Sequence, residues 1–162
     1  MRTIGVAAIL AALSLPALSA DLTPGDFRAL LAESDATAVL RSLDEASWNA
    51  FLIHVEAGDR GWIDLVPLLA AGTDARTSES LVITLSRALR ANPQGVLSVL
   101  ASSSYAASDI CVDNEIEIST LDAVRLIDEA LVKVAGVLDP ALSQVRNECI
   151  YALSDARIAA LI

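Results

Sequence analysis

The sequence has few of the residues on which catalytic sites most often depend. His54 is the only histidine among the 162 residues, and a general base there would need a nucleophile or an orienting carboxylate beside it. Glu56 and Asp59 are close in sequence, but Glu56, two residues further along a helix, points elsewhere, and Ser47 lies too far back. We therefore interpret His54 as a partly exposed helix residue.

Fingerprints of the common enzyme classes are also missing from the sequence. There is no G-x-S-x-G, H-E-x-x-H, P-loop or dinucleotide pattern, no C-x-x-C pair and no calcium-binding loop of the EF-hand type. Adjacent acids such as Asp44 and Glu45 diverge on a helix, whereas glycosidases need two acids that converge across a cleft. We expect no catalytic residue, no resident metal and no cofactor.

Positive charge is scarce. The sequence contains 11 Lys and Arg residues and 21 Asp and Glu residues, which gives a formal net charge of −10. Because an acidic surface is repelled by nucleic acid and by anionic lipid, neither is an expected partner. A protein with basic patches is the natural complement. The only lysine, Lys133, against ten arginines is typical of GC-rich bacterial genes.

The first twenty residues have the pattern of a secretory signal. Arg2 precedes the short apolar stretch Ile4–Leu15, and the small residues around Ala20 suit cleavage on either side of it. The apolar stretch is short for a membrane span, which needs about 20 residues; an uncleaved anchor is the alternative to a cleaved signal. We expect residues 21–162 to form a single domain, located in the bacterial periplasm or secreted, and not bound to a membrane after cleavage. Loss of Arg2 would change the net charge from −10 to −11.

Two cysteines, Cys111 and Cys149, fall within that domain. Disulfides persist in exported proteins, so we predict a structural bridge between them. Closing a chain loop of this size would stabilise the fold by about 4 kcal/mol. A metal site is a poorer interpretation, because two cysteines and one distant histidine make a weak ligand set.

Helical periodicity predicts an all-α fold. Trp48, Phe51, Leu52 and Val55, for example, follow the i, i+3, i+4, i+7 spacing of one helix face. We expect helices over Asp21–Ala32, Ala36–Leu43, Ser47–Glu56, Trp62–Leu69, Leu81–Leu89, Pro93–Leu100 and Leu121–Leu138, and a last helix from Pro140 through Leu153. Gly58 ends the third of these as a C-cap, and Asn92 and Ser119 are expected N-caps. Both tryptophans lie on apolar stripes, so core packing is their default role.

The stretch Asp109–Ile118 does not fit a helix, because its apolar residues alternate with acids. We expect an ordered loop, with a short extended piece, tethered by Cys111. Its acids are the densest oxygen cluster of the chain: Asp109, Asp113, Glu115 and Glu117. They could form an acidic edge that binds a basic partner, supply oxygens to a calcium ion, or be a plain solvated loop.

Two stretches, Trp62–Asn92 and Leu121–Ile162, share a plan of helix, short acidic turn and helix. The first has Pro67 inside its first helix and Asp74 in its turn; the second turns at Asp139 and continues as Val-Arg-Asn-Glu-Cys-Ile-Tyr-Ala-Leu. This plan resembles the HEAT family of helical repeats. The resemblance covers about half of residues 21–162, although the first stretch lacks the Val-Arg step and the second lacks the proline. It implies a short stack of antiparallel helix pairs, with a kink at Pro67.

Our leading hypothesis from the sequence is a non-catalytic periplasmic protein-binding module. A concrete version is an immunity or inhibitor protein that blocks a toxin delivered by neighbouring cells. The alternative is a cell-envelope hydrolase or metal-binding protein that uses the acidic loop 109–117. A structural component of an assembly is a third hypothesis, and the sequence leaves the oligomeric state open.

Overall fold

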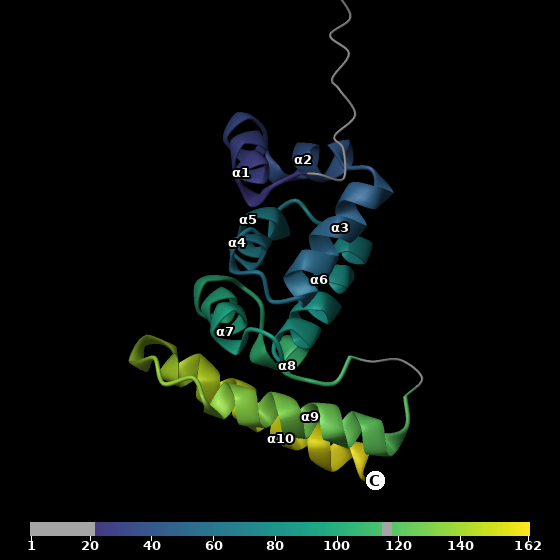
Figure 1. The fold of residues 1–162 in the computed structure, drawn as a ribbon, viewed down its shortest axis with the longest axis vertical. Helices are drawn as coiled ribbons and strands as arrows, with labels where there is room; N and C mark the ends of the chain where they lie inside the picture. Colours follow the sequence, from purple (N-terminus) through teal and green to yellow (C-terminus); the bar gives the residue numbers. More distant parts are fainter. Residues whose placement is uncertain (1–21, 115–117) are drawn as a thin grey trace, which may run out of the picture.

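A computed structural model describes residues 22–114 and 118–162, and within these ranges the chain is all α-helical, with helices packed in pairs and no strand (Figure 1). The predicted signal segment, residues 1–20, lies outside the described residues. The helices are α1 (Pro24–Glu33), α2 (Ala36–Ser42), α3 (Glu45–Glu56), α4 (Arg60–Ile63), α5 (Val66–Ala70), α6 (Ala75–Ala88), α7 (Pro93–Ser102), α8 (Ala107–Ile110), α9 (Thr120–Ala135), the 3-10 turn η1 (Pro140–Leu142) and α10 (Ser143–Ala160).

Side-chain caps mark the starts of several helices, α7 and α9 among them. Asn92 Oδ1 accepts a hydrogen bond from the Gly95 backbone N–H at 2.9 Å, and Ser119 caps α9 in the same way. Gly58, which follows α3, has a φ of 85°, a value that favours glycine over residues with a side chain. These three predictions from the sequence are confirmed.

Asn92 also connects two parts of the chain. Its Nδ2 donates to the carbonyl oxygen of Gly58 at 2.8 Å while its Oδ1 caps α7. A Cβ added to Gly58 would lie 2.9 Å from the Cβ of Ala91, so the end of α3 can approach the start of α7 this closely only because residue 58 is a glycine. One amide side chain therefore fixes the end of α3 relative to the start of α7.

The helix predicted over Trp62–Leu69 is broken in the structure rather than kinked. α4 ends at Ile63, and α5 starts at Val66 with Pro67 in its first turn. Proline has no backbone N–H, and its ring clashes with the carbonyl four residues earlier, which belongs to Ile63. A proline is tolerated in the first turn of a helix, so the chain restarts there.

Breaking this helix changes how the first predicted repeat packs. α6 packs mainly against α3, whereas α5 lies against α2 and α7. The second predicted repeat does form a pair, because α9 and α10 make the most extensive helix contact described. Its turn also differs in detail, since Asp139 caps the short η1 and α10 begins at Ser143.

The core runs continuously from α1 to α10. Its largest fully buried side chains are Phe27, Val39, Phe51, Ile63, Leu65, Leu69, Leu81, Leu85, Leu89, Leu97, Ile110 and Leu153. In Figure 1, α1 and α2 lie at one end of the molecule and the α9–α10 pair at the other, with α3 to α8 between them.

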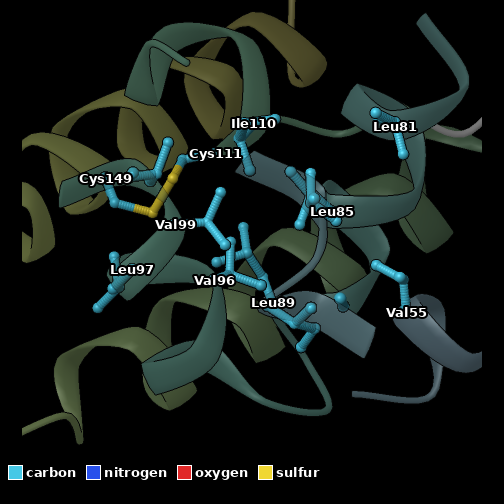
Figure 2. Close-up of a cluster of buried hydrophobic side chains, with 14 of the residues drawn as sticks. Val55, Leu81, Leu85, Leu89, Val96, Leu97, Val99, Ile110, Cys111 and Cys149 are labelled. Carbon is cyan, nitrogen blue, oxygen red and sulfur yellow. A yellow bond between two sulfur atoms is a disulfide. The ribbon is translucent and has the colours of Figure 1, made fainter. Parts of the chain in front are cut away.

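The predicted disulfide between Cys111 and Cys149 is present, with a Cα–Cα distance of 5.2 Å. Figure 2 shows it among the buried side chains of Leu97, Val99 and Ile110. Both cysteines are fully buried. Next to it, the hydroxyl of Ser86 donates to the carbonyl oxygen of Val112 at 2.6 Å. The bridge thus joins the end of α8 to the middle of α10.

Replacing both cysteines, Cys111→Ala with Cys149→Ala, should lower the free energy of unfolding by about 4 kcal/mol, because the bridge closes a separation of 38 residues. Guanidinium unfolding followed by circular dichroism measures this loss. The unsubstituted protein with its bridge reduced should lose a similar amount. A loss below about 1 kcal/mol in both samples would show that the bridge contributes little to stability.

Gly72 allows the end of α5 to lie directly on the start of α2. A Cβ built on Gly72 would lie 2.4 Å from the carbonyl carbon of Ala36 and 2.4 Å from the amide nitrogen of Thr37. Both atoms belong to the backbone, so neither can rotate out of the way. The position of α2 therefore depends on the absence of a side chain at residue 72.

Gly72→Ala should destabilise the protein by about 1–3 kcal/mol, because α2 must move to relieve the overlap. Gly136→Ala is the matched control. A Cβ at Gly136 would have its nearest neighbour at 3.4 Å, an ordinary contact. Thermal and denaturant unfolding of the two variants should separate them clearly, and equal midpoints would contradict the close contact.

Candidate protein-binding surface

The predicted acidic cluster is only partly within the described residues. Asp109 is exposed on α8, and Asp113 is half-buried just after the disulfide. Glu115 and Glu117 lie outside the described residues, as does the middle of the expected extended piece. The structure therefore places two of the four predicted partner-binding acids near the junction of α8 with α10.

The start of this stretch is helical, which corrects the expectation of a loop from Asp109 onward. Ile110 belongs to α8, and the Cys111 backbone N–H donates to the carbonyl oxygen of Ala107 at 2.8 Å. The alternation of apolar residues was misleading here, because Ile110 and Cys111 are consecutive and both are fully buried. A single helical turn directs both side chains into the core.

No group of three or more His, Cys, Asp or Glu side chains in residues 22–114 and 118–162 could hold a metal ion. A calcium site in the acidic loop would therefore have to involve Glu115 or Glu117. The same ranges contain no helix that is long and apolar enough to cross a bilayer.

His54 is exposed on α3 and has a carboxylate partner. Its Nδ1 lies 2.7 Å from Oδ2 of Asp59, and its ring stacks on Trp62 with the ring centres 4.8 Å apart. The glycine turn at Gly58 brings Asp59 back toward His54, which spacing along a helix does not reveal. His54 covers one side of Trp62 at the edge of the aromatic core.

An aromatic cluster connects the core to the surface. Phe27, Phe51 and Trp62 are buried, with ring centres 5.4–5.7 Å apart. Trp48 stacks on Phe51 in a nearly parallel arrangement, with centres 5.4 Å apart, and is only partly buried. The core role expected of both tryptophans thus holds for Trp62, whereas Trp48 is shared between core and surface.

Trp48 lines one of three adjoining hollows that surround α2. The middle hollow has a volume of about 580 Å³, and those on either side have about 380 Å³ and 230 Å³. The middle hollow and the hollow at Trp48 have four lining residues in common: Leu40, Leu43, Asp74 and Thr77. The middle hollow and the 380 Å³ hollow have three in common: Thr37, Arg41 and Ala71. We call this continuous open depression the α2 groove.

The α2 groove is acidic at its Trp48 end, whereas one acid and one base line each of the other two hollows. The hollow at Trp48 is lined by three acids, Asp44, Glu45 and Asp74, and by one base, Arg76. The Ser47 backbone N–H lowers the pKa of Asp44, and the Thr77 backbone N–H does the same for Asp74. Both carboxylates cap helices, so they are held at fixed positions and stay ionised below the usual pH range for aspartate.

The groove could not be located from the sequence, although each of its parts left a signal there. Asp74 is recognisable as a helix cap, and Trp48 as part of an apolar stripe. Their proximity depends on the packing of α3 against α6 and of α2 against α5, which no local pattern encodes. Comparison with known proteins adds no guidance, because no family model, curated protein or solved structure matches this chain.

Asp74→Ala should lower the thermal midpoint of the protein at neutral pH, because the N-terminus of α6 loses its cap. The pKa of Asp74 is lower in the folded state than in the unfolded state. The ionised carboxylate therefore stabilises the folded protein above the unfolded pKa, and this stabilisation is lost as pH falls through the folded pKa. The difference in thermal midpoint between the Asp74→Ala variant and the parent protein should therefore become smaller in strong acid.

The control for the cap is Glu79→Ala, which removes an exposed acid further along α6. Its thermal midpoint should stay close to that of the parent at every pH. If the Asp74→Ala difference were independent of pH down to the acid limit of folding, the ionised carboxylate would not be the capping group.

Proposed function

We propose that the chain is an exported, non-catalytic binding protein that captures a protein partner in the α2 groove through a basic segment of that partner. The observation that supports this proposal most directly is the placement of Trp48 in an open concave surface, next to carboxylates that are already fixed as helix caps. Concavity and a rigid aromatic side chain are features of protein-binding hot spots.

Trp48 is well suited to anchor a partner. Its ring stacks on Phe51, which is fully buried, so the ring is held in place before any partner arrives. Binding to a preorganised side chain avoids the entropy cost of ordering it. Tryptophan is also the preferred aromatic partner of an arginine or lysine cation.

The charges beside Trp48 complement a cation. Asp44, Glu45 and Asp74 against Arg76 leave a net charge of −2 at this end of the groove. An arginine of the partner could lie on the indole ring and hydrogen-bond a carboxylate through its planar guanidinium group. Arg41, toward the other end, would suit an acid on the same segment, which gives the groove a direction.

Export and the kind of partner are further parts of the proposal. The buried disulfide is consistent with an oxidising compartment, and the pattern of residues 1–20 favours export to the bacterial periplasm. The resemblance to HEAT repeats agrees with a binding role, because such stacks act through extended surfaces, although a fold does not fix a function. An immunity or inhibitor protein, which occupies a toxin or enzyme without reacting with it, is the concrete version we propose.

The test begins with capture of partners from a periplasmic extract by the tagged protein, followed by mass spectrometry and by affinity measurement with the purified partner. Trp48→Ala should weaken binding by about 30-fold, the loss typical of a hot-spot aromatic. Ile53→Ala is its control, since Ile53 is an exposed residue of the same helix, 66% accessible, outside the groove.

Charge reversal tests the electrostatic contribution to partner binding in the α2 groove. Glu45→Lys should slow association and weaken its dependence on salt, whereas Glu33→Lys, an exposed change at the end of α1, should affect both much less. Circular dichroism of each variant verifies that the fold is intact. Capture of no specific protein, or capture that is insensitive to Trp48→Ala, would refute binding through the groove.

A further inference from the structure

The arginines of the chain differ in whether their guanidinium groups have a partner. Four of them form ion pairs with a carboxylate: Arg60, Arg87, Arg125 and Arg157. Within residues 22–114 and 118–162, the guanidinium groups of Arg28, Arg41 and Arg76 have no hydrogen-bonding or ion-pair partner. Two of these three, Arg41 and Arg76, line the α2 groove.

Arg76 has no ion-pair partner although carboxylates line the same hollow. Besides Arg76 and Trp48, the lining of this hollow includes three acids: Asp44, Glu45 and Asp74. Asp74 is engaged in capping α6, because its Oδ1 accepts from the Thr77 backbone N–H at 2.8 Å and from the Thr77 hydroxyl at 2.7 Å. The N–H donors of the Arg76 guanidinium group are therefore available to a group outside the described chain.

The position of Arg76 within its helix is electrostatically unfavourable. Arg76 is the second residue of α6, and the first turn of this helix contains no acid. The N-terminal end of a helix carries partial positive charge, so an acid is preferred there and a cation is disfavoured. Natural proteins break such local rules mainly at functional sites. The stability of α6 therefore does not explain an arginine at this position.

The acids of the groove do not by themselves select a partner. With a formal net charge of −10, the chain attracts polycations of every kind. Discrimination among partners that are all attracted requires a repulsive element at the site as well as an attractive one. At the Trp48 end of the α2 groove, Arg76 is the only base in the lining.

We propose that Arg76 determines which basic segments bind in the α2 groove, by binding the carboxylate of an acid that lies next to the arginine placed on Trp48. This inference rests on the proposed binding of a basic segment in the groove. The planar guanidinium group of Arg76 can donate two parallel hydrogen bonds to a carboxylate, while Asp44 and Glu45 attract the partner's arginine. A segment with two neighbouring bases would place its second base against Arg76, and like charges at an interface repel each other. The groove thus selects an arginine with a nearby acid over a run of bases.

An array of short immobilised peptides tests this selection. Each peptide has one arginine in an otherwise neutral sequence and, near it, a glutamate, a glutamine or a second arginine. Physiological salt is used, because it screens the general attraction of the acidic chain for cations. The parent protein should bind the glutamate series most strongly. Arg76→Glu should change the ratio of glutamate-series to second-arginine-series affinity by at least about tenfold in favour of the second arginine, since an attractive contact becomes repulsive and the reverse.

Arg28→Glu is the matched control. It makes the same change of charge at an exposed arginine of α1 that also has no partner and that lines none of the three hollows, so the affinity ratio should stay close to that of the parent. A second readout is stability: Arg76→Gln should not lower the thermal midpoint, because it removes a cation from the N-terminal end of α6. A clearly lower midpoint would show that Arg76 serves the fold and would contradict the proposal.

Trp48→Ala separates this inference from the function on which it rests. If Trp48→Ala abolishes peptide binding but Arg76→Glu leaves the affinity ratio unchanged, selection by Arg76 is refuted and binding in the groove stands. Preference of the parent protein for the second-arginine series would have the same meaning. If Trp48→Ala does not weaken binding, or if the parent protein binds none of the three series, both the selection and the binding of a basic segment in the groove are refuted.

Discussion

A buried covalent bond joins α10 to the end of α8, and the attachment of the α9–α10 pair to the rest of the molecule depends on it. The inner stripe of this pair, which includes Ile127, Val134 and Leu153, is shielded from water between the two helices and against α7 and α8. Helix pairs in a stack contact only their neighbours, so a terminal pair has one interface rather than two. The bond keeps that interface closed even when side-chain packing alone would allow it to open.

The attraction that the α2 groove offers to a partner has two physical origins. One is a rigid indole ring, and the other is a set of carboxylates whose charge is held in place by backbone donors. The groove lies at the opposite end of the molecule from the α9–α10 pair (Figure 1).

Much of the local structure could be predicted from the sequence, because local rules govern it. Asn92 and Ser119 cap helices since their side chains reach a backbone donor three residues on, and the helical periodicity of the apolar residues marks the faces that are buried. The disulfide was predictable because the chain has only two cysteines. Where the predictions were wrong, a competing local rule decided the outcome: Pro67 ended a helix instead of bending it, and Ile110 with Cys111 adopted a helical turn in place of an extended one. The α2 groove lay beyond sequence reasoning, because Leu40 of α2, Trp48 of α3 and Asp74, the N-cap of α6, are brought together by tertiary packing.

The double hydrogen bond of Asn92 has a consequence for recognising distant relatives of this chain. A serine or an aspartate could replace Asn92 as a cap, but neither has the amide N–H that reaches the carbonyl oxygen of Gly58. Any side chain at residue 58 would in turn push Ala91 away. We therefore expect residues 58 and 92 to be constrained jointly, so a glycine followed 34 positions later by an asparagine and a proline should persist in descendants whose remaining sequence has diverged.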